Sequence, residues 1–227
     1  MIVQDLRSAR CARQDAEGSA EPLTVIAGIE RSWLQFEALQ RRHVSKRAAE
    51  STFVRLRSRR TQFGAGVRVS RRARLLTRPG DEIILGDGCV IFEGALLATY
   101  GGHIRLGTGC TVNPYTVLYG HGGLDIGDHV RIAAHVLVVP ANHVFEDPDV
   151  PIANQGETRR GIVIEDDVWI GAGAIVLDGV TVGSGAVIGA GSVVTQKIPE
   201  LAVAVGNPAR VVRYRGERQT MPIGRTA

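Results

Sequence analysis

Residues 164–194 read IEDDVWIGAGAIVLDGVTVGSGAVIGAGSVV, and an aliphatic residue occupies every sixth position of this stretch. These positions are Ile164, Ile170, Val176, Val182, Ile188 and Val194. A second register, four residues further on, is always small or aliphatic: Val168, Ala174, Val180, Ala186, Ser192 and Ile198. A period of six fits neither a helix nor a plain alternating strand, but it is typical of short strands and turns that coil around one axis. The stretch therefore predicts an all-β solenoid.

The same register continues toward the N-terminus in groups of three. The groups are Phe63, Val69 and Leu75; Leu85, Ile91 and Leu97; Leu106, Val112 and Leu118; and Ile126, Ile132 and Val138. Each group predicts one triangular coil, which makes about six coils over residues 63–199. Successive groups are 10, 9, 8 and 26 residues apart instead of six, and every insertion follows a third face. The insertions therefore stack along one corner, where the longest, at 139–163, is expected to project as a loop and to carry the function.

Residues 1–60 differ from this repeat, and we predict three parts: a basic segment at 1–60, the solenoid at 61–200 and a tail at 201–227. Residues 1–78 hold 17 Lys and Arg against 7 Asp and Glu. Ile26, Ile29, Trp33 and Phe36 recur at spacings of three and four, which favours an amphipathic helix within residues 26–50. The helix is expected to cover the open first coil. The alternative is that its basic residues hold the protein on an anionic membrane surface.

Composition excludes several classes of protein. No motif with interleaved aromatic residues accompanies the basic segment, so nucleic-acid binding is not expected. The three cysteines form no CxxC pair, and an odd count argues against a disulfide framework. Cys89 and Cys110 fall on the small inward register, which predicts packing rather than catalysis. The N-terminus has no apolar run that would form a signal peptide, so we expect a soluble cytoplasmic protein.

Several motifs, in order, carry a family resemblance over about residues 63–215. They are Ala141-Asn142-His143, a Pro-rich loop with Gln155, Ile164 to Gly171, Gly189 to Val194, and Gly206-Asn207-Pro208-Ala209-Arg210. With them the chain resembles the hexapeptide-repeat acyltransferases, particularly the sugar O-acetyltransferases of the galactoside, maltose and capsular-polysaccharide type. The resemblance implies a left-handed parallel β-helix, a homotrimer, and acetyl-coenzyme A as acyl donor in a groove between neighbouring prisms. It implies no metal, and a sugar or polysaccharide precursor as acceptor.

His143 matches the catalytic histidine of that family, and the resemblance implies that it is the general base. An imidazole with a pKa near about 6.5 can take the proton of a hydroxyl while the oxygen attacks a thioester. A solvated loop side chain is the alternative. Asn113 matches an asparagine that contacts the acceptor, although it also suits a turn before Pro114.

The resemblance also assigns the donor site. The backbone N–H of Ala172 is expected to stabilise the oxyanion. Trp169 is expected to line the groove. The alternative is that its side chain merely covers the corner of the coil. Turn residues Ala190 and Gly191 are expected to lie against the pantetheine arm. Arg210 is expected to pair with a phosphate of coenzyme A. The lysine that often follows Val-Thr in the family is replaced here by Gln196, with Lys197 one place later, which puts a phosphate contact of Lys197 in doubt.

Three other functions compete with O-acyl transfer. Transfer to an amine differs only in the acceptor. His103, His121 and His143 are all expected in insertions at the same corner, and three imidazoles can hold a catalytic zinc as in carbonic anhydrases, but these three are not in register with one another. A solenoid can also be a scaffold without chemistry.

Overall fold

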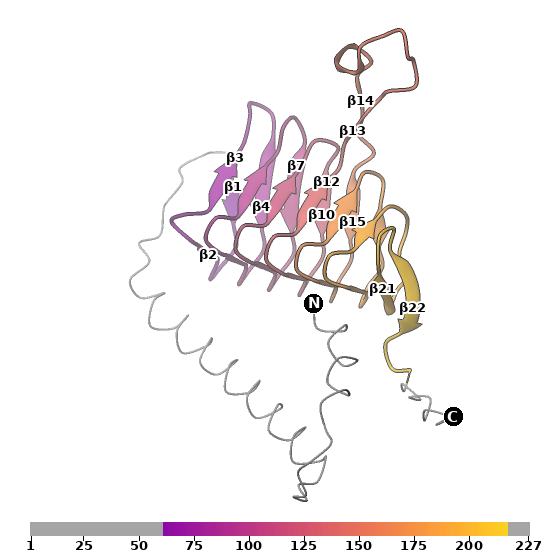
Figure 1. Cartoon of the computed structure of the whole chain (residues 1–227). Coiled ribbons are helices and arrows are strands. Elements are labelled where there is room, and N and C mark those ends of the chain that lie inside the picture. The colour runs from indigo at the N-terminus through magenta and orange to yellow at the C-terminus, as the bar shows by residue number, and fades with distance from the viewer. Residues whose placement is uncertain (1–60, 218–227) are drawn as a thin grey trace, which may run out of the picture. The chain divides into compact units, whose positions relative to one another are not determined.

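Strands of two to five residues alternate with turns along residues 61–217, the part of the chain that this computed structural model describes. Equivalent strands of successive coils pair in parallel, so they form the three faces of a solenoid (Figure 1). The first face contains β1 (Thr61–Phe63), β4 (Glu82–Leu85), β7 (His103–Leu106), β10 (Leu124–Ile126), β15 (Ile162–Ile164) and β18 (Thr181–Val182). The second contains β2 (Arg68–Val69), β5 (Val90–Ile91), β8 (Thr111–Val112), β11 (Arg131–Ile132), β16 (Trp169–Ile170), β19 (Val187–Ile188), β21 (Ala202–Val205) and β22 (Arg210–Tyr214). The third contains β3 (Arg74–Leu76), β6 (Leu96–Ala98), β9 (Val117–Tyr119), β12 (Leu137–Val139), β17 (Ile175–Leu177) and β20 (Val193–Val194).

The strand register confirms the six-residue repeat and the stack of about six coils. Ile126 pairs with Ile164, Ile132 with Ile170 and Val138 with Val176, although the long insertion separates these two coils in the sequence. The insertion therefore leaves the stacking of the coils intact. At the C-terminal end β21 adds a strand to the second face, and β22 folds back antiparallel on it.

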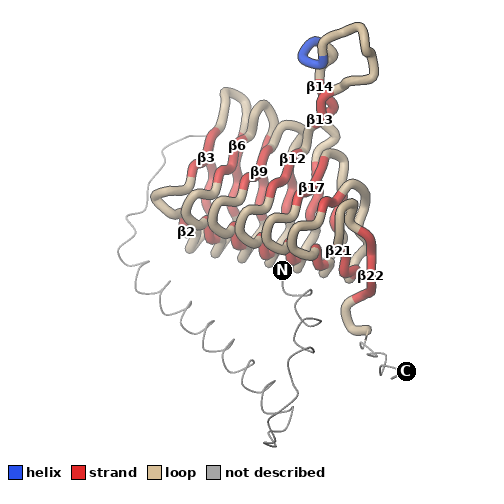
Figure 2. The backbone as a smooth tube through the Cα atoms, viewed as in Figure 1, coloured by secondary structure: helices blue, strands red, loops and turns tan. Residues whose placement is uncertain are grey.

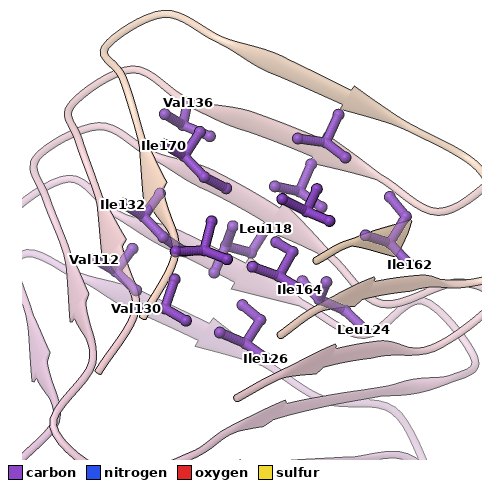
Figure 3. Close-up of a cluster of buried hydrophobic side chains, with 14 of the residues drawn as sticks. Val112, Leu118, Leu124, Ile126, Val130, Ile132, Val136, Ile162, Ile164 and Ile170 are labelled. Carbon is purple, nitrogen blue, oxygen red and sulfur yellow. The ribbon is translucent and has the colours of Figure 1, made fainter. Parts of the chain in front are cut away.

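The inward positions form one continuous apolar core along the axis of the solenoid. Figure 3 shows part of it, with Leu118, Leu124, Ile164 and Ile170 from three faces converging on the axis. Burying one such side chain contributes about 1.5–3 kcal/mol, but a single coil leaves its core open on both sides. Stacked coils cover one another, which explains why the repeat is needed for stability.

Two predicted inward positions differ from the expectation. Phe63 stands in register opposite Leu85, yet it is 39% exposed. Ile198 is buried as expected, but it pairs with Val182 of the first face. This last coil, with 16 residues from Val182 to Ile198, is therefore two residues shorter than the one before it, in which Ile164 pairs with Val182.

The corners of the prism differ in length, and one of them carries all the insertions. We call the corner between the third and first faces the insertion corner; its segments are 77–81, 99–102, 120–123 and 140–161. The last of these projects beyond the coils (Figure 2), with the hairpin strands β13 (Asn142–His143) and β14 (Glu157–Thr158) at its base and the 3-10 helix η2 (Ile152–Asn154) further out. The prediction of a long loop at one corner is confirmed.

Cys89 and Cys110 are fully buried at the inward positions that the sequence predicted. Their thiols donate to the carbonyl oxygens of Gly107 and Gly127, each at 3.0 Å. Contact with the Cys89 thiol and burial raise the pKa of Cys110. A protonated, buried thiol is a packing group rather than a nucleophile.

The helix predicted within residues 26–50, the basic segment 1–60 and the end of the tail lie outside the described residues. Within 61–217, no helix reaches the length and apolar character that crossing a bilayer requires.

Candidate active site

The long loop begins and ends in a short hairpin that carries His143. Strand β13 pairs antiparallel with β14, so His143 stands opposite Glu157 and Asn142 opposite Thr158. The His143 side chain is exposed. The hairpin extends from the insertion corner away from the coils (Figure 1), so a ligand can reach this imidazole from outside the prism.

Glu157 places a negative charge beside His143. Arg159 donates to Glu157 Oε2 through Nη2 at 2.9 Å and through Nε at 3.1 Å. These hydrogen bonds and the positive charge of Arg159 hold the pKa of Glu157 below its usual value. The carboxylate is therefore ionised at neutral pH.

The shorter insertions build an aromatic cluster at the same corner. The Tyr100 ring lies 5.1 Å from that of Tyr119 and 4.9 Å from the His121 imidazole, centroid to centroid, and the Arg78 guanidinium lies 5.1 Å from the Tyr100 ring centre. Burial lowers the pKa of His121. Its buried Nδ1 has no hydrogen-bond partner within residues 61–217. The cluster therefore holds a neutral imidazole.

Four of the predicted site residues lie on another edge, the second corner, between the second and third faces. The corner turns stack, because His135 N–H donates to Pro114 O at 3.2 Å, Gly173 N–H to Ala134 O at 3.0 Å and Gly191 N–H to Ala172 O at 2.9 Å. Asn113, Ala172, Ala190 and Gly191 thus lie along one line parallel to the solenoid axis. Asn113 also donates from Nδ2 to Ile132 O at 2.7 Å, which is the bond expected of a turn residue.

The second corner presents backbone donors. Ala172 and Ala190 are exposed, and within residues 61–217 neither backbone N–H donates to another group of the chain. Gly171 is needed for this close stacking, because a Cβ there would lie 2.6 Å from Ala190 N. The corner therefore carries two free amides, one coil apart, on a rigid edge.

Trp169 projects from the second face beside that corner. It lies in β16, two residues before Gly171, and pairs with Arg131 on one side and Val187 on the other. Its side chain is 55% exposed, whereas its neighbour Ile170 is fully buried. An indole this exposed offers an apolar surface to a ligand.

Arg210 and Lys197 lie apart from each other. Arg210 begins β22 opposite Val205, is exposed, and donates from Nη1 to Ala209 O at 2.9 Å. Lys197 is exposed and follows the third-face strand β20, in the turn that leads back to the first face. The structure therefore does not bring Lys197 to the edge that carries Ala190 and Gly191.

His143 and the second-corner residues also lie on different edges of one prism. His143 follows the third face, whereas Asn113, Ala172 and Ala190 precede it. The whole third sheet separates the two sets within one chain (Figure 2).

The structure does not bring the three histidines of the zinc hypothesis together. His103 begins β7 instead of lying in an insertion, and its Nε2 lies 3.1 Å from Asp125 Oδ2. His121 is part of the aromatic cluster, and His143 is on the hairpin. In the described part of the chain, no group of three or more His, Cys, Asp or Glu side chains is placed to hold a metal ion.

Two site features were missed at the level of sequence. Glu157 is matched to His143 only by hairpin register, and a two-residue ladder leaves no pattern in the sequence. Asp178 holds the returning end of the long loop from the next coil. The sequence signal for Asp178 is only that a carboxylate stands in the short turn after the third face, in the coil that follows the long loop.

Comparison with known proteins confirms the resemblance to hexapeptide-repeat transferases. Residues 161–196 match the family described as bacterial transferase hexapeptide (six repeats). The galactoside O-acetyltransferase of Lactococcus lactis is 37% identical over 130 residues, which are 57% of this chain and 61% of that protein. The 2,3,4,5-tetrahydropyridine-2,6-dicarboxylate N-acetyltransferase of Staphylococcus aureus is 41% identical over 58 residues, 26% of this chain and 24% of that protein. This chain thus spans less than two thirds of the length of either relative.

A solved structure shares the fold. AntD, an N-acyltransferase from Bacillus cereus solved in complex with dTDP and 3-hydroxybutyryl-CoA, is 26% identical with a TM-score of 0.60. The similarity covers 67% of this chain and 81% of that chain. The relatives taken together thus include transferases to nitrogen as well as to oxygen.

Proposed function

We propose that this chain, which carries the hexapeptide repeat of bacterial transferases, is a coenzyme A-dependent acyltransferase that moves an acetyl group onto a sugar hydroxyl. The observation that carries the proposal is the pair of complementary features on one prism. An exposed imidazole stands on a projecting hairpin, and free backbone amides lie beside an exposed indole on another edge. A base and an oxyanion donor are what acyl transfer from a thioester requires.

In the proposed reaction, His143 accepts the proton of the acceptor hydroxyl while its oxygen attacks the thioester carbonyl. The Ala172 N–H donates to the oxyanion of the tetrahedral intermediate. Collapse of the intermediate breaks the carbon–sulfur bond, and the imidazolium returns its proton to the departing thiolate. The products are the acyl ester and free coenzyme A.

Two protomers would build each site. Because the third sheet separates His143 from Ala172 within one chain, the proposal needs the hairpin of one copy beside the second corner of the next. A threefold ring of left-handed prisms meets this need, since it closes with three equivalent sites. A particle of three 24.3 kDa chains in sedimentation velocity supports this arrangement, and an active monomer contradicts it.

The second corner would bind the donor. Trp169 offers an apolar surface for the pantetheine arm, and Ala190 and Gly191 let it approach the backbone closely. Arg210 supplies a cation for a phosphate of coenzyme A. Lys197 lies between the third and first faces, so it could contact a phosphate only from that corner and not from the second corner. The proposed chemistry uses no metal.

The acceptor is proposed to be a sugar or polysaccharide precursor contacted by Asn113. The galactoside O-acetyltransferase of Lactococcus lactis favours a hydroxyl acceptor. The N-acyltransferase AntD, a mutant of which was solved with dTDP-4-amino-4,6-dideoxyglucose, favours the alternative of an amino sugar. The same base serves both, since an ammonium group must lose a proton before its nitrogen attacks.

We also propose a cytoplasmic setting, in which two buried free thiols remain reduced. The basic segment 1–60 is proposed to cover the first coil, or to hold the enzyme on anionic lipid. Loss of binding to anionic vesicles on deletion of residues 1–60 would favour the second role.

The test of this function is donor binding followed by an acceptor screen. Calorimetry with acetyl-coenzyme A should show saturable binding, and absence of heat would leave a solenoid without chemistry. Release of free thiol should then be followed with galactosides, nucleotide-linked sugars and nucleotide-linked amino sugars. Faster release with the amino sugars would move the assignment to N-acyl transfer.

A further inference from the structure

The hairpin that carries His143 is rooted in two different coils. Its outgoing end is held from the preceding coil, where Gly122 N–H donates to Pro140 O at 3.1 Å. Its returning end is held from the following coil, where Gly179 N–H donates to Gly161 O at 2.9 Å. The direction of the hairpin therefore depends on how these two roots are fastened.

One carboxylate fastens the returning root. Asp178 lies in the turn between β17 and β18, and its side chain is only 4% exposed. Its Oδ1 accepts the backbone N–H of Arg160 at 2.9 Å and that of Gly161 at 3.1 Å. Its Oδ2 accepts the hydroxyl of Thr158 at 2.9 Å.

These three bonds reach the strand that faces His143. Thr158 belongs to β14 and stands opposite Asn142, the residue that precedes His143. Asp178 thus bonds directly to Thr158 of the hairpin ladder and to Arg160 and Gly161 just after the hairpin. A buried carboxylate with three donors is costly to disturb, because each donor would lose its partner.

We propose that Asp178 is a positioning residue, which fixes the angle of the β13–β14 hairpin and thereby the place of His143. Asp178 touches neither reacting group. Its effect on turnover rests on the proposed function of His143, whereas its effect on the hairpin does not.

The chain provides a matched control in Asp81. This carboxylate is also buried at the insertion corner and accepts three donors, from Thr99 Oγ1 at 2.5 Å, Gly101 N at 2.9 Å and Arg78 N at 3.2 Å. It fastens the shorter insertions, which do not include the hairpin. A general loss of stability should therefore appear in both variants, and a loss of positioning only in the Asp178 variant.

The experiment compares Thr158→Val, Thr158→Ser, Asp178→Ala and Asp81→Ala in the full chain. Amide hydrogen exchange of residues 140–161, followed by mass spectrometry, reports the hairpin itself. Steady-state kinetics with acetyl-coenzyme A report the place of the imidazole, as a fall in kcat with little change in the KM of the donor. Displacement of a reacting group by about 1 Å can cost up to about 100-fold in rate.

We expect Thr158→Val and Asp178→Ala to speed exchange in residues 140–161 and to lower kcat about 10-fold to 100-fold. Thr158→Ser, which keeps the hydroxyl, should leave both the exchange of residues 140–161 and kcat near their wild-type values. Unchanged exchange in Asp178→Ala, or an equal fall in kcat in Asp81→Ala, would overturn the proposal. If His143→Ala keeps full turnover, the proposed function of His143 fails instead, and the exchange data alone decide whether Asp178 fixes the hairpin.

Discussion

Glu157 stands directly opposite His143 in the antiparallel ladder of β13 and β14. Directly opposed residues of such a ladder place their side chains on the same face. Arg159 donates two hydrogen bonds to the carboxylate, at 2.9 and 3.1 Å. An ionised carboxylate therefore lies across the ladder from an exposed imidazole, and its negative charge would favour the cation that forms if the ring takes a proton.

Replacement of Glu157 by Gln should lower kcat about 10-fold, because the imidazolium loses a nearby negative charge. Since the pKa of Glu157 is lowered, chiefly by Arg159, the carboxylate stays ionised from about pH 5 to 8, so its loss should lower kcat throughout this range. Initial rates of thiol release at saturating donor measure kcat at each pH. Glu146→Gln, on the same loop, is the control, and equal rates for the Glu157 variant and this control would rule out the role.

Replacement of Asp81 by Ala should lower the free energy of unfolding by about 1–3 kcal/mol at pH 7, because its three donors lose their acceptor. Burial opposes ionisation of Asp81, yet the Thr99 hydroxyl and the amides of Gly101 and Arg78 hold its pKa below the ordinary value of 3.8. The stability that the charge contributes is therefore present above about pH 4 and is lost as the pH falls through the lower folded-state pKa. Urea unfolding at pH 7 and at pH 3 should show a smaller difference at pH 3, and a larger one would contradict the assignment.

Replacement of Gly171 by Ala should weaken acetyl-coenzyme A binding, since the new Cβ would lie 2.6 Å from Ala190 N and 2.8 Å from Ile188 O. The second corner must shift to admit it, at a cost of about 1–3 kcal/mol in stability. Gly173→Ala, where open space surrounds the position but φ is +67°, should cost about 1–2 kcal/mol from strain and leave donor affinity closer to wild type. Calorimetry on the two variants separates these effects, and equal affinities would remove the second corner from the donor site.

Replacement of Trp169 by Ala should change stability by less than about 0.5 kcal/mol, because the side chain is 55% exposed. It should weaken donor binding about 10-fold if the indole lines the groove. Ile170→Ala should do the opposite, losing about 2–5 kcal/mol of stability through a core cavity. Thermal unfolding and calorimetry on both variants test the contrast, and an unchanged dissociation constant for the Trp169 variant would leave it as a surface residue.

The solenoid could be predicted because its core is periodic. The inward residues from Leu85 to Val194 that the sequence marked follow one six-residue rule, and an insertion that lengthens one gap from six to 26 residues leaves that rule intact. The rule does not predict Ile104, Leu124 and Ile162, which are buried two positions earlier on the first face. The physical cause is that each coil is stable only against the next, so the repeat must hold wherever coils stack. The place of the long loop followed from the same count.

The site was less predictable, since it depends on contacts that have no period. Lys197 and Gly191 are close in the sequence, but the third-face strand β20 lies between them, so they are on different edges. The prediction that His103 lies in an insertion is wrong, because β7 is four residues long and begins three residues before the inward Leu106. Asp178 resembles a turn residue until the returning root of the loop is seen against it.

The most direct measurement is the turnover of His143→Ala with acetyl-coenzyme A and an accepted sugar. We expect kcat to fall about 100-fold to 10,000-fold, while donor affinity and thermal stability stay near wild type, because the side chain is exposed and lies off the second corner. Turnover that stays within a few-fold of wild type would contradict the account.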